Sequence, residues 1–188
     1  MKRGKIVLFC LLMVVCFTAG DWLTASAEDT KSTLIGTPKC KVCHKSEKRG
    51  DQYSVWEKSA HAKAFEVLAT EEALAVAAEK GLGNPQEAPE CLVCHTTQAF
   101  LGDVGLDPKG KYTAEEGIGC EACHGAGSEY KSNKVMKDPD AAKAAGLIMP
   151  GKEQCLECHN EKSPTYKEFD FETRWAEIKH PKAAPEEG

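Results

Sequence analysis

Apolar residues recur at helical spacing between residues 51 and 69. His61, Phe65 and Leu68 fall on one stripe at positions i, i+4 and i+7, with further apolar residues beside them. This spacing is typical of a helix with one apolar face. We therefore predict a single helix over 51–69 that directs His61 towards the interior.

A second apolar stripe lies near the C-terminus. Phe171, Trp175 and Ile178 follow helical spacing in the stretch 169–179, which predicts a last helix. His180 comes directly after it and precedes a proline, a residue that disfavours helical backbone at the position before it. The helix is thus expected to end there, next to an imidazole.

Start and stop signals predict two more helices. Thr70 is suited to cap a helix over 71–80, and Asp138, followed by a proline, begins a short helix through Ala145. The glycine- and proline-rich stretch before Tyr112 indicates irregular chain, with at most a short hairpin. No large sheet is expected, so the predicted fold class is mainly α, with short helices and long loops.

The N-terminal segment 1–27 has the layout of a signal peptide. Basic residues precede an apolar run over 6–19, and small residues end the segment. We predict cleavage after residue 27 and export to the periplasm as one domain, 28–188. Cys10 and Cys16 would then be lost with the peptide. Two alternatives retain the segment, as an uncleaved membrane anchor or through lipidation at Cys16.

The mature domain is small and acidic. Residues 28–188 carry 21 Lys or Arg and 28 Asp or Glu, a net charge of −7. They contain no second apolar stretch long enough to span a bilayer, so no stable membrane insertion is expected after cleavage. The acidic charge disfavours nucleic acid and favours a basic redox partner, although it also serves ordinary solubility. Polar composition predicts a loose leader over 28–37 and a mobile tail over 181–188.

The chemistry of the chain is concentrated in four copies of Cys-x-x-Cys-His. Zinc sites and disulfides also use paired cysteines, but neither explains a histidine after every second cysteine. The pattern is typical of c-type haem, whose vinyl groups react with the two thiols and whose iron binds the histidine. The four copies are Cys40, Cys43 and His44; Cys91, Cys94 and His95; Cys120, Cys123 and His124; and Cys155, Cys158 and His159.

Four covalently bound haem c groups are therefore predicted, and electron transfer is the first hypothesis. The mature domain provides about forty residues per haem, too few to build a separate protein core around each one. The haems must form much of the core themselves. We expect them to be stacked close together, with the short helices packed around them.

A count of histidines limits the axial ligands. Four irons have eight axial positions, whereas the chain has six histidines. Outside the motifs only His61 and His180 remain as distal imidazoles, so at least two irons lack a second histidine. For these irons, Met136 is a better thioether candidate than Met149, while tyrosine, lysine and water also remain open. An iron with an open position could bind NO, nitrite or hydroxylamine.

Three runs of the sequence resemble the tetrahaem cytochrome c-554 family. They are Cys-Lys-Val-Cys-His at 40–44, Trp-Glu-Lys-Ser-Ala-His-Ala-Lys-Ala at 56–64 and Gly-Ile-Gly-Cys-Glu-Ala-Cys-His-Gly-Ala-Gly at 117–127. The resemblance implies a mostly helical, haem-packed fold that accepts electrons in the periplasm and passes them on. In ammonia oxidisers it implies hydroxylamine oxidoreductase as the donor.

The same resemblance implies a set of ligand pairings. By this reading His61 is the distal ligand of the third haem, opposite His124. His180 serves the first haem, opposite His44. The haem on His95 matches the five-coordinate, high-spin site of the family.

The fourth haem is where the sequence departs from that family. Residues 128–131 read Ser-Glu-Tyr-Lys where the family has a distal histidine. Met136, Tyr130, a lysine or a vacant position would then complete the iron on His159. The main functional hypothesis is an electron carrier between redox partner proteins. The alternatives are a reductase of a small nitrogen compound such as NO, at the haem on His95, and a subunit docked to a larger redox assembly.

Overall fold

The computed structural model describes residues 31–181. The proposed signal peptide, 1–27, with Cys10 and Cys16, lies outside the described residues, as does the tail over 182–188. Those predictions therefore stay predictions. Within the described part of the chain, no helix is long and apolar enough to cross a membrane.

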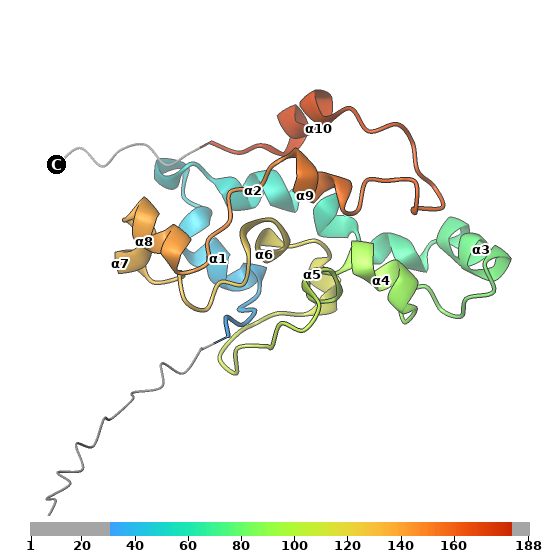
Figure 1. Ribbon diagram of the computed structural model, residues 1–188, viewed down its shortest axis with the longest axis horizontal. Helices are drawn as coiled ribbons and strands as arrows, with labels where there is room; N and C mark the ends of the chain where they lie inside the picture. Colours follow the sequence, from blue (N-terminus) through green and yellow to red (C-terminus); the bar gives the residue numbers. More distant parts are fainter. Residues whose placement is uncertain (1–30, 182–188) are drawn as a thin grey trace, which may run out of the picture. The chain divides into compact units, whose positions relative to one another are not determined.

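Short helices joined by loops make up residues 31–181 (Figure 1). The predicted fold class, mainly α, is thus confirmed. The predicted hairpin near Tyr112 is wrong, because the described chain has as its only β pairing an isolated parallel bridge between Leu34 and Leu106. The α-helices are α1 Thr37–His44, α2 Gln52–Glu57, α3 Glu71–Glu79, α4 Pro89–His95, α5 Thr97–Leu101, α6 Cys120–His124, α7 Asn133–Met136, α8 Pro139–Ala144, α9 Lys152–Leu156 and α10 Phe171–Ile178. The 3-10 helices are η1 Glu47–Arg49, η2 His61–Lys63, η3 Glu66–Ala69 and η4 Ala114–Glu116.

Three helices begin where the sequence indicates. The Thr70 hydroxyl accepts a hydrogen bond from the Ala73 N–H at 3.2 Å and caps α3. Asp138 caps α8 in the same way, and Asp170 accepts from the Thr173 N–H at 2.8 Å to cap α10. Each side chain satisfies a donor that a first helical turn leaves without a backbone partner. These predicted helices are confirmed.

The continuous helix predicted over 51–69 is wrong. Helix α2 ends at Glu57, and the chain continues through the 3-10 helices η2 and η3. At the break the Ser59 hydroxyl donates to the Trp56 carbonyl at 2.7 Å. Such a local bond competes with the helical ladder. His61 therefore begins a separate element, with an orientation that the helical stripe did not predict.

The loose leader predicted over 28–37 also needs correction where the structure describes it. Leu34 is 0 % exposed and Ile35 is 2 % exposed. The N–H groups of Ile35 and Gly36 donate to the buried carboxylate of Glu121 at 3.0 and 2.8 Å. Charge-assisted hydrogen bonds of this kind hold the segment against α6. Polar composition alone did not reveal this partner, because it is distant in sequence.

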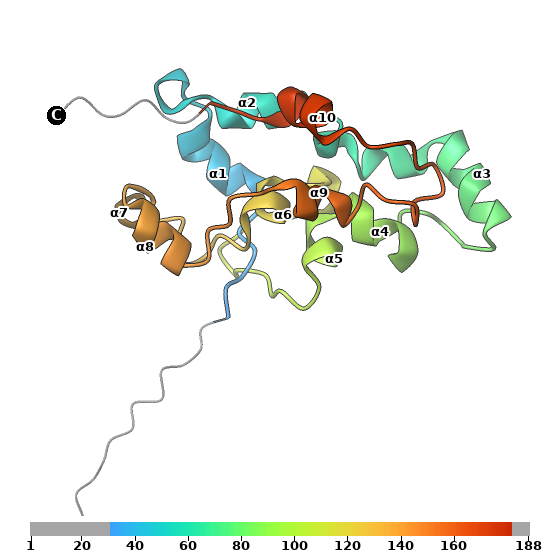
Figure 2. The same cartoon turned by 45° about the horizontal axis from the view of Figure 1, so that its top comes forward.

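The helices that carry the motifs gather in the middle of this part of the chain. Helix α6 contacts both α1 and α5, and α4 packs on α5. In both Figure 1 and Figure 2 the C-terminal helix α10 lies alongside α2. Segments from the two ends of the described chain therefore meet near the first motif.

Candidate haem-binding site

Each Cys-x-x-Cys-His motif lies on a short helix. Helices α1, α4 and α6 end at the histidine of their motif, while α9 ends just before the second cysteine of the fourth motif. Positions three apart on a helix face the same side, so each pair of thiols points in one direction. All eight described cysteines are free of disulfides. Residues 31–181 also gather no group of three or more His, Cys, Asp or Glu side chains suited to a metal ion alone.

Three of the motif histidines have Nδ1 engaged with an oxygen. An Nδ1–H that donates to such an oxygen fixes the tautomer and leaves Nε2 free to bind a metal. This is the arrangement that a haem iron requires of its histidine ligand. The oxygens are Gln52 Oε1 for His44 at 3.1 Å, the Ala64 carbonyl for His95, and the Ile148 carbonyl for His124 at 2.9 Å.

The fourth motif histidine is oriented by packing. The His159 ring stacks on Phe169, with ring centroids 4.5 Å apart and planes 16° from parallel. Burial lowers the pKa of His159, and it does the same for His124, His61 and His180. A lowered pKa favours neutral imidazole, which is the form that binds iron. The donor set of the chain thus fits c-type haem.

The two histidines outside the motifs each face a motif histidine. The centroids of the His61 and His159 rings are 6.0 Å apart, and those of His180 and His124 are 5.9 Å apart. The structure therefore brings both predicted distal ligands into the site. Their neighbours differ from the pairings that the family resemblance implied, which set His61 against His124 and His180 against His44.

His61 is held by the loop that leads into the third motif. Its carbonyl accepts a hydrogen bond from the Ile118 N–H at 3.0 Å, and the Ile118 carbonyl accepts from the Trp56 indole N–H at 2.8 Å. Gly117 has φ +64°, and a Cβ there would lie 2.6 Å from the His61 carbonyl oxygen. Only glycine permits this approach. The position of His61 is therefore set by backbone contacts.

Thiols from different motifs approach one another. The first and third motifs adjoin through one pair of thiols within hydrogen-bonding reach, and the second and fourth motifs adjoin through another. A third pair, from the third and fourth motifs, lies within electrostatic range. The four motifs are thus adjacent in the order first, third, fourth, second. The pairs are Cys40 with Cys120, Cys94 with Cys158, and Cys123 with Cys155.

A buried polar network that sequence reasoning missed joins the first and third motifs. The Thr37 N–H and hydroxyl each donate to the Glu116 carboxylate at 3.0 Å, and the Thr37 hydroxyl accepts from the Cys120 N–H at 3.2 Å. Burial raises the pKa of Glu116 to about 7. Nothing in the sequence separates these side chains from polar residues that face solvent.

The other candidate ligands lie in different surroundings. Tyr130 is 7 % exposed, and its hydroxyl donates to the Gly125 carbonyl at 2.6 Å. Burial raises the pKa of Tyr130 and so disfavours the phenolate that would bind iron. Met149 is 60 % exposed, whereas Met136 is half-buried at the end of α7. Met136 therefore remains the better thioether candidate.

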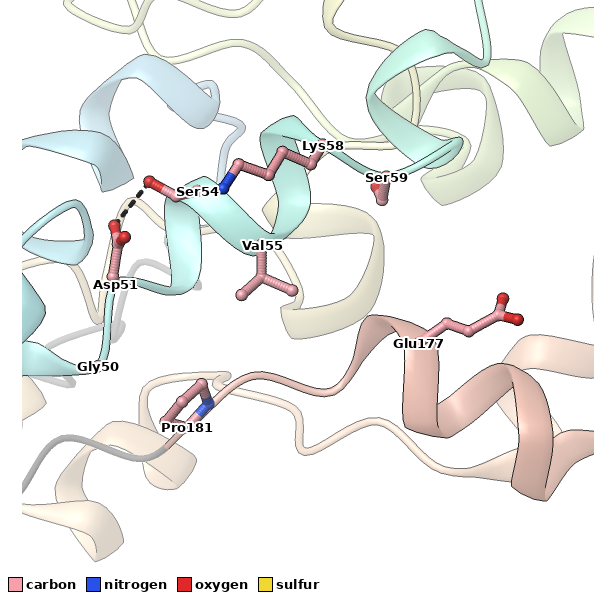
Figure 3. A pocket seen from close by; sticks show the side chains of 8 residues that line it. All are labelled: Gly50, Asp51, Ser54, Val55, Lys58, Ser59, Glu177 and Pro181. Carbon is pink, nitrogen blue, oxygen red and sulfur yellow. Dashed lines mark hydrogen bonds between the residues drawn. The ribbon is translucent and has the colours of Figure 1, made fainter.

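A hollow of about 450 Å³ lies between α2 and the C-terminal segment (Figure 3). Its lining is largely polar and includes no residue of the four motifs. It is therefore separate from the haem-attachment chemistry. The lining residues are Gly50, Asp51, Ser54, Val55, Lys58, Ser59, Glu177 and Pro181.

Comparison with known proteins decides the family. Residues 39–125 match the family described as cytochrome c554 and c-prime. Cytochrome c-554 of Nitrosomonas europaea is 31 % identical over 179 residues, which cover 82 % of this chain and 68 % of that protein. The chain belongs to the cytochrome c-554 family.

A solved structure of the reduced state of cytochrome c554 from Nitrosomonas europaea shares 24 % identity with the chain. It covers 78 % of each chain, with a TM-score of 0.47. Membership of the cytochrome c-554 family makes this protein a c-type cytochrome that carries electrons and binds four covalent haem c groups. Each bound haem supplies an iron that can gain or lose one electron.

Proposed function

We propose that this protein is a periplasmic tetrahaem cytochrome that shuttles electrons between redox partner proteins. Each motif attaches one haem through its two cysteines and binds the iron through its histidine. Residues 1–27 direct export and are removed, which leaves 28–188 as the electron-carrying domain. The engaged Nδ1 atoms of His44, His95 and His124 support this proposal, because they leave Nε2 available to iron.

The observation that carries the proposal is the adjacency of attachment thiols from different motifs. A haem lies next to the cysteines to which it is bonded, so adjacent cysteines bring the edges of their haems close together. The order of contacts supports an electron path from the first haem through the third and fourth to the second. Gln154 strengthens the central step, since its amide N–H donates to the Ala122 carbonyl at 2.7 Å and so links α9 to α6.

The charge of the domain supports a basic partner. Residues 28–188 have a net charge of −7, and an acidic surface steers a basic protein into encounter at a rate that falls as salt screens the attraction. The first and second motifs lie at the two ends of the proposed path. Donor and acceptor are therefore expected to dock near these ends.

Two measurements on the haem-loaded protein test the proposal. Pyridine haemochrome analysis should give four haems per chain, and reductive titration should take up four electrons. Stopped-flow mixing with a basic mono-haem cytochrome should then show electron exchange whose second-order rate falls at least tenfold between low and high salt. Fewer than four haems, or exchange that is insensitive to salt, would contradict the proposal. Sustained turnover of NO under reducing conditions would instead favour the reductase alternative.

A further inference from the structure

We propose that His180 binds the iron of the haem on His124 and that His61 binds the iron of the haem on His159. The irons on His44 and His95 then have no distal histidine and accept a diatomic ligand. This inference rests on the proposed attachment of one haem to each motif. It assigns each distal histidine to a particular iron.

The spacing of the rings carries the first step. A bond between imidazole and a first-row metal is about 2 Å long and the ring centroid lies about 1 Å behind Nε2, so two axial imidazoles have centroids about 6 Å apart. The observed separations are 6.0 Å for His61 and His159 and 5.9 Å for His180 and His124. Axial rings can turn freely about the axis through the iron. The interplanar angles of 70° and 43° are therefore both compatible with ligation.

The side chain of Gln52 argues against His180 as a ligand of the first haem. Gln52 Oε1 lies 3.1 Å from His44 Nδ1, and its amide N–H donates to the Pro181 carbonyl at 3.0 Å. The segment that carries His180 is therefore tied to the Nδ1 side of His44. An iron bound to His44 lies on the opposite, Nε2 side, and its distal ligand lies farther out again. Figure 3 shows the same segment, with Pro181, following α2.

The segment around His61 repeats this arrangement at the other end of the path. The Ala64 carbonyl is hydrogen bonded to Nδ1 of His95, so η2 and the residues after it lie behind the second motif histidine. The His61 ring at the start of η2 faces His159. In both cases one segment supports the histidine of an outer haem from behind and presents an imidazole to the neighbouring inner haem.

The cysteine contacts agree with these assignments independently of the ring distances. Cys40 adjoins Cys120, which pairs the first motif with the third, and Cys94 adjoins Cys158, which pairs the second with the fourth. Each distal histidine thus belongs to one such pair of haems. The two inner irons have two imidazoles each, while the two ends of the electron path keep an exchangeable position.

Ligand binding and spectroscopy on the haem-loaded protein test the assignment. The reduced native protein should bind two CO molecules per chain, and the oxidised protein should give two low-spin and two high-spin ferric haems by electron paramagnetic resonance. His180→Ala and His61→Ala should each convert one low-spin haem to high-spin and raise the CO count to three. Added imidazole should restore the low-spin signal. A count of one CO in the native protein, or no change in either variant, would overturn the proposal.

The position of the extra ligand identifies the iron. In crystals of His180→Ala soaked with azide, density should appear on the iron of His124, in addition to the irons of His44 and His95. In His61→Ala the extra density should appear on the iron of His159. If His180→Ala leaves the iron of His124 six-coordinate and the native crystal shows His180 bound to the iron of His44, the assignment is wrong.

Two controls separate this inference from the proposed function. The pyridine haemochrome count and four-electron titration test haem attachment and electron uptake, and both should be unchanged in the alanine variants. If these hold while the ligand positions differ, only the pairing fails. Should an alanine variant not mature, the crystal structure of the native haem-loaded protein gives the same answer from its iron–Nε2 bonds.

Discussion

The third and fourth motifs are held in place by very different means. In α6, Glu121 is 0 % exposed and Ala122 is 3 % exposed, and the Glu121 carboxylate accepts hydrogen bonds from three backbone N–H groups. Helix α9 has no buried residue, and Leu156 at its end is 38 % exposed. The polypeptide thus builds a packed setting for the third motif only.

This difference indicates how each haem is positioned. Around the third motif, the N-terminal segment and the loop before α6 are fixed by the protein's own hydrogen bonds. Around the fourth motif, the main contacts are the stacked ring of Phe169, the amide of Gln154 and the facing imidazole of His61. We therefore expect the fourth motif to depend more on haem attachment and iron ligation for its order.

The largest effect is expected from Glu121→Gln. The carboxylate accepts N–H groups from Ile35, Gly36 and Gly127 in a fully buried position. An amide would present its NH₂ group to one of these donors and remove the charge. We expect the free energy of unfolding to fall by about 3 kcal/mol, measured by urea unfolding of the haem-loaded protein with far-ultraviolet circular dichroism.

Glu72→Gln provides a matched control for this substitution. Glu72 is exposed in the first turn of α3, so the same chemical change there should alter stability by less than about 0.5 kcal/mol. Equal losses in the two variants would mean that the third motif does not depend on its buried carboxylate.

A smaller, pH-dependent effect is expected at Glu116. Burial, with a minor contribution from the charge of Glu121, raises its pKa from 4.5 to about 7 against the opposing hydrogen bonds of Thr37. The folded state therefore binds the proton more tightly than the unfolded state. The stability from protonation is complete below pH 4.5 and is lost as the pH rises towards 7. We expect a loss of about 2 kcal/mol over this range, after allowance for partial exposure.

Glu116→Gln should remove this pH dependence. The neutral amide still offers an oxygen to Thr37, so the difference in unfolding free energy between pH 5 and pH 8 should shrink by most of that amount. Glu115→Gln is the control, because Glu115 is fully exposed. An unchanged pH profile in Glu116→Gln would show that Glu116 titrates normally in the folded protein.

Local features of the fold could be predicted from the sequence, whereas long-range partners could not. Thr70 and Asp138 begin their helices as predicted because the capping bond spans only a few residues. The break after α2 was missed because it depends on contacts with the loop around Ile118. Glu121 was missed for a similar reason, since its partners lie more than eighty residues away in the N-terminal segment.

The candidate site shows the same division. The motifs and the count of histidines follow directly from residue identity, and both His61 and His180 do lie against motif histidines. Which motif histidine each one faces depends on tertiary contacts, such as the bridge made by Gln52. No pattern in the sequence reveals such a contact.

Gln154→Leu tests the link between the two motifs. The Gln154 amide donates to the carbonyls of Ala122 and Cys123 at 2.7 and 3.2 Å, and leucine keeps the volume but removes both bonds. Because the site is only partly buried, we expect a loss of about 1 kcal/mol in the free energy of unfolding. Gln86→Leu is the control, because its amide makes one longer bond, at 3.4 Å to Phe65. A loss as large as that of Glu121→Gln would mean that the fourth motif is packed as firmly as the third.

The smallest effect on stability is expected from Phe169→Leu. The stacked ring contact with His159 contributes about 0.5–1 kcal/mol beyond simple burial, and Phe169 is only half-buried. The spectroscopic effect should be clearer, because the stacking sets the rotation of the His159 ring about the axis through the iron. We expect one low-spin signal in electron paramagnetic resonance to shift while the other stays in place, with four haems still attached. If neither signal moves, the His159 ring is fixed by its iron bond and by His61, which would make ligation the dominant constraint on the fourth motif.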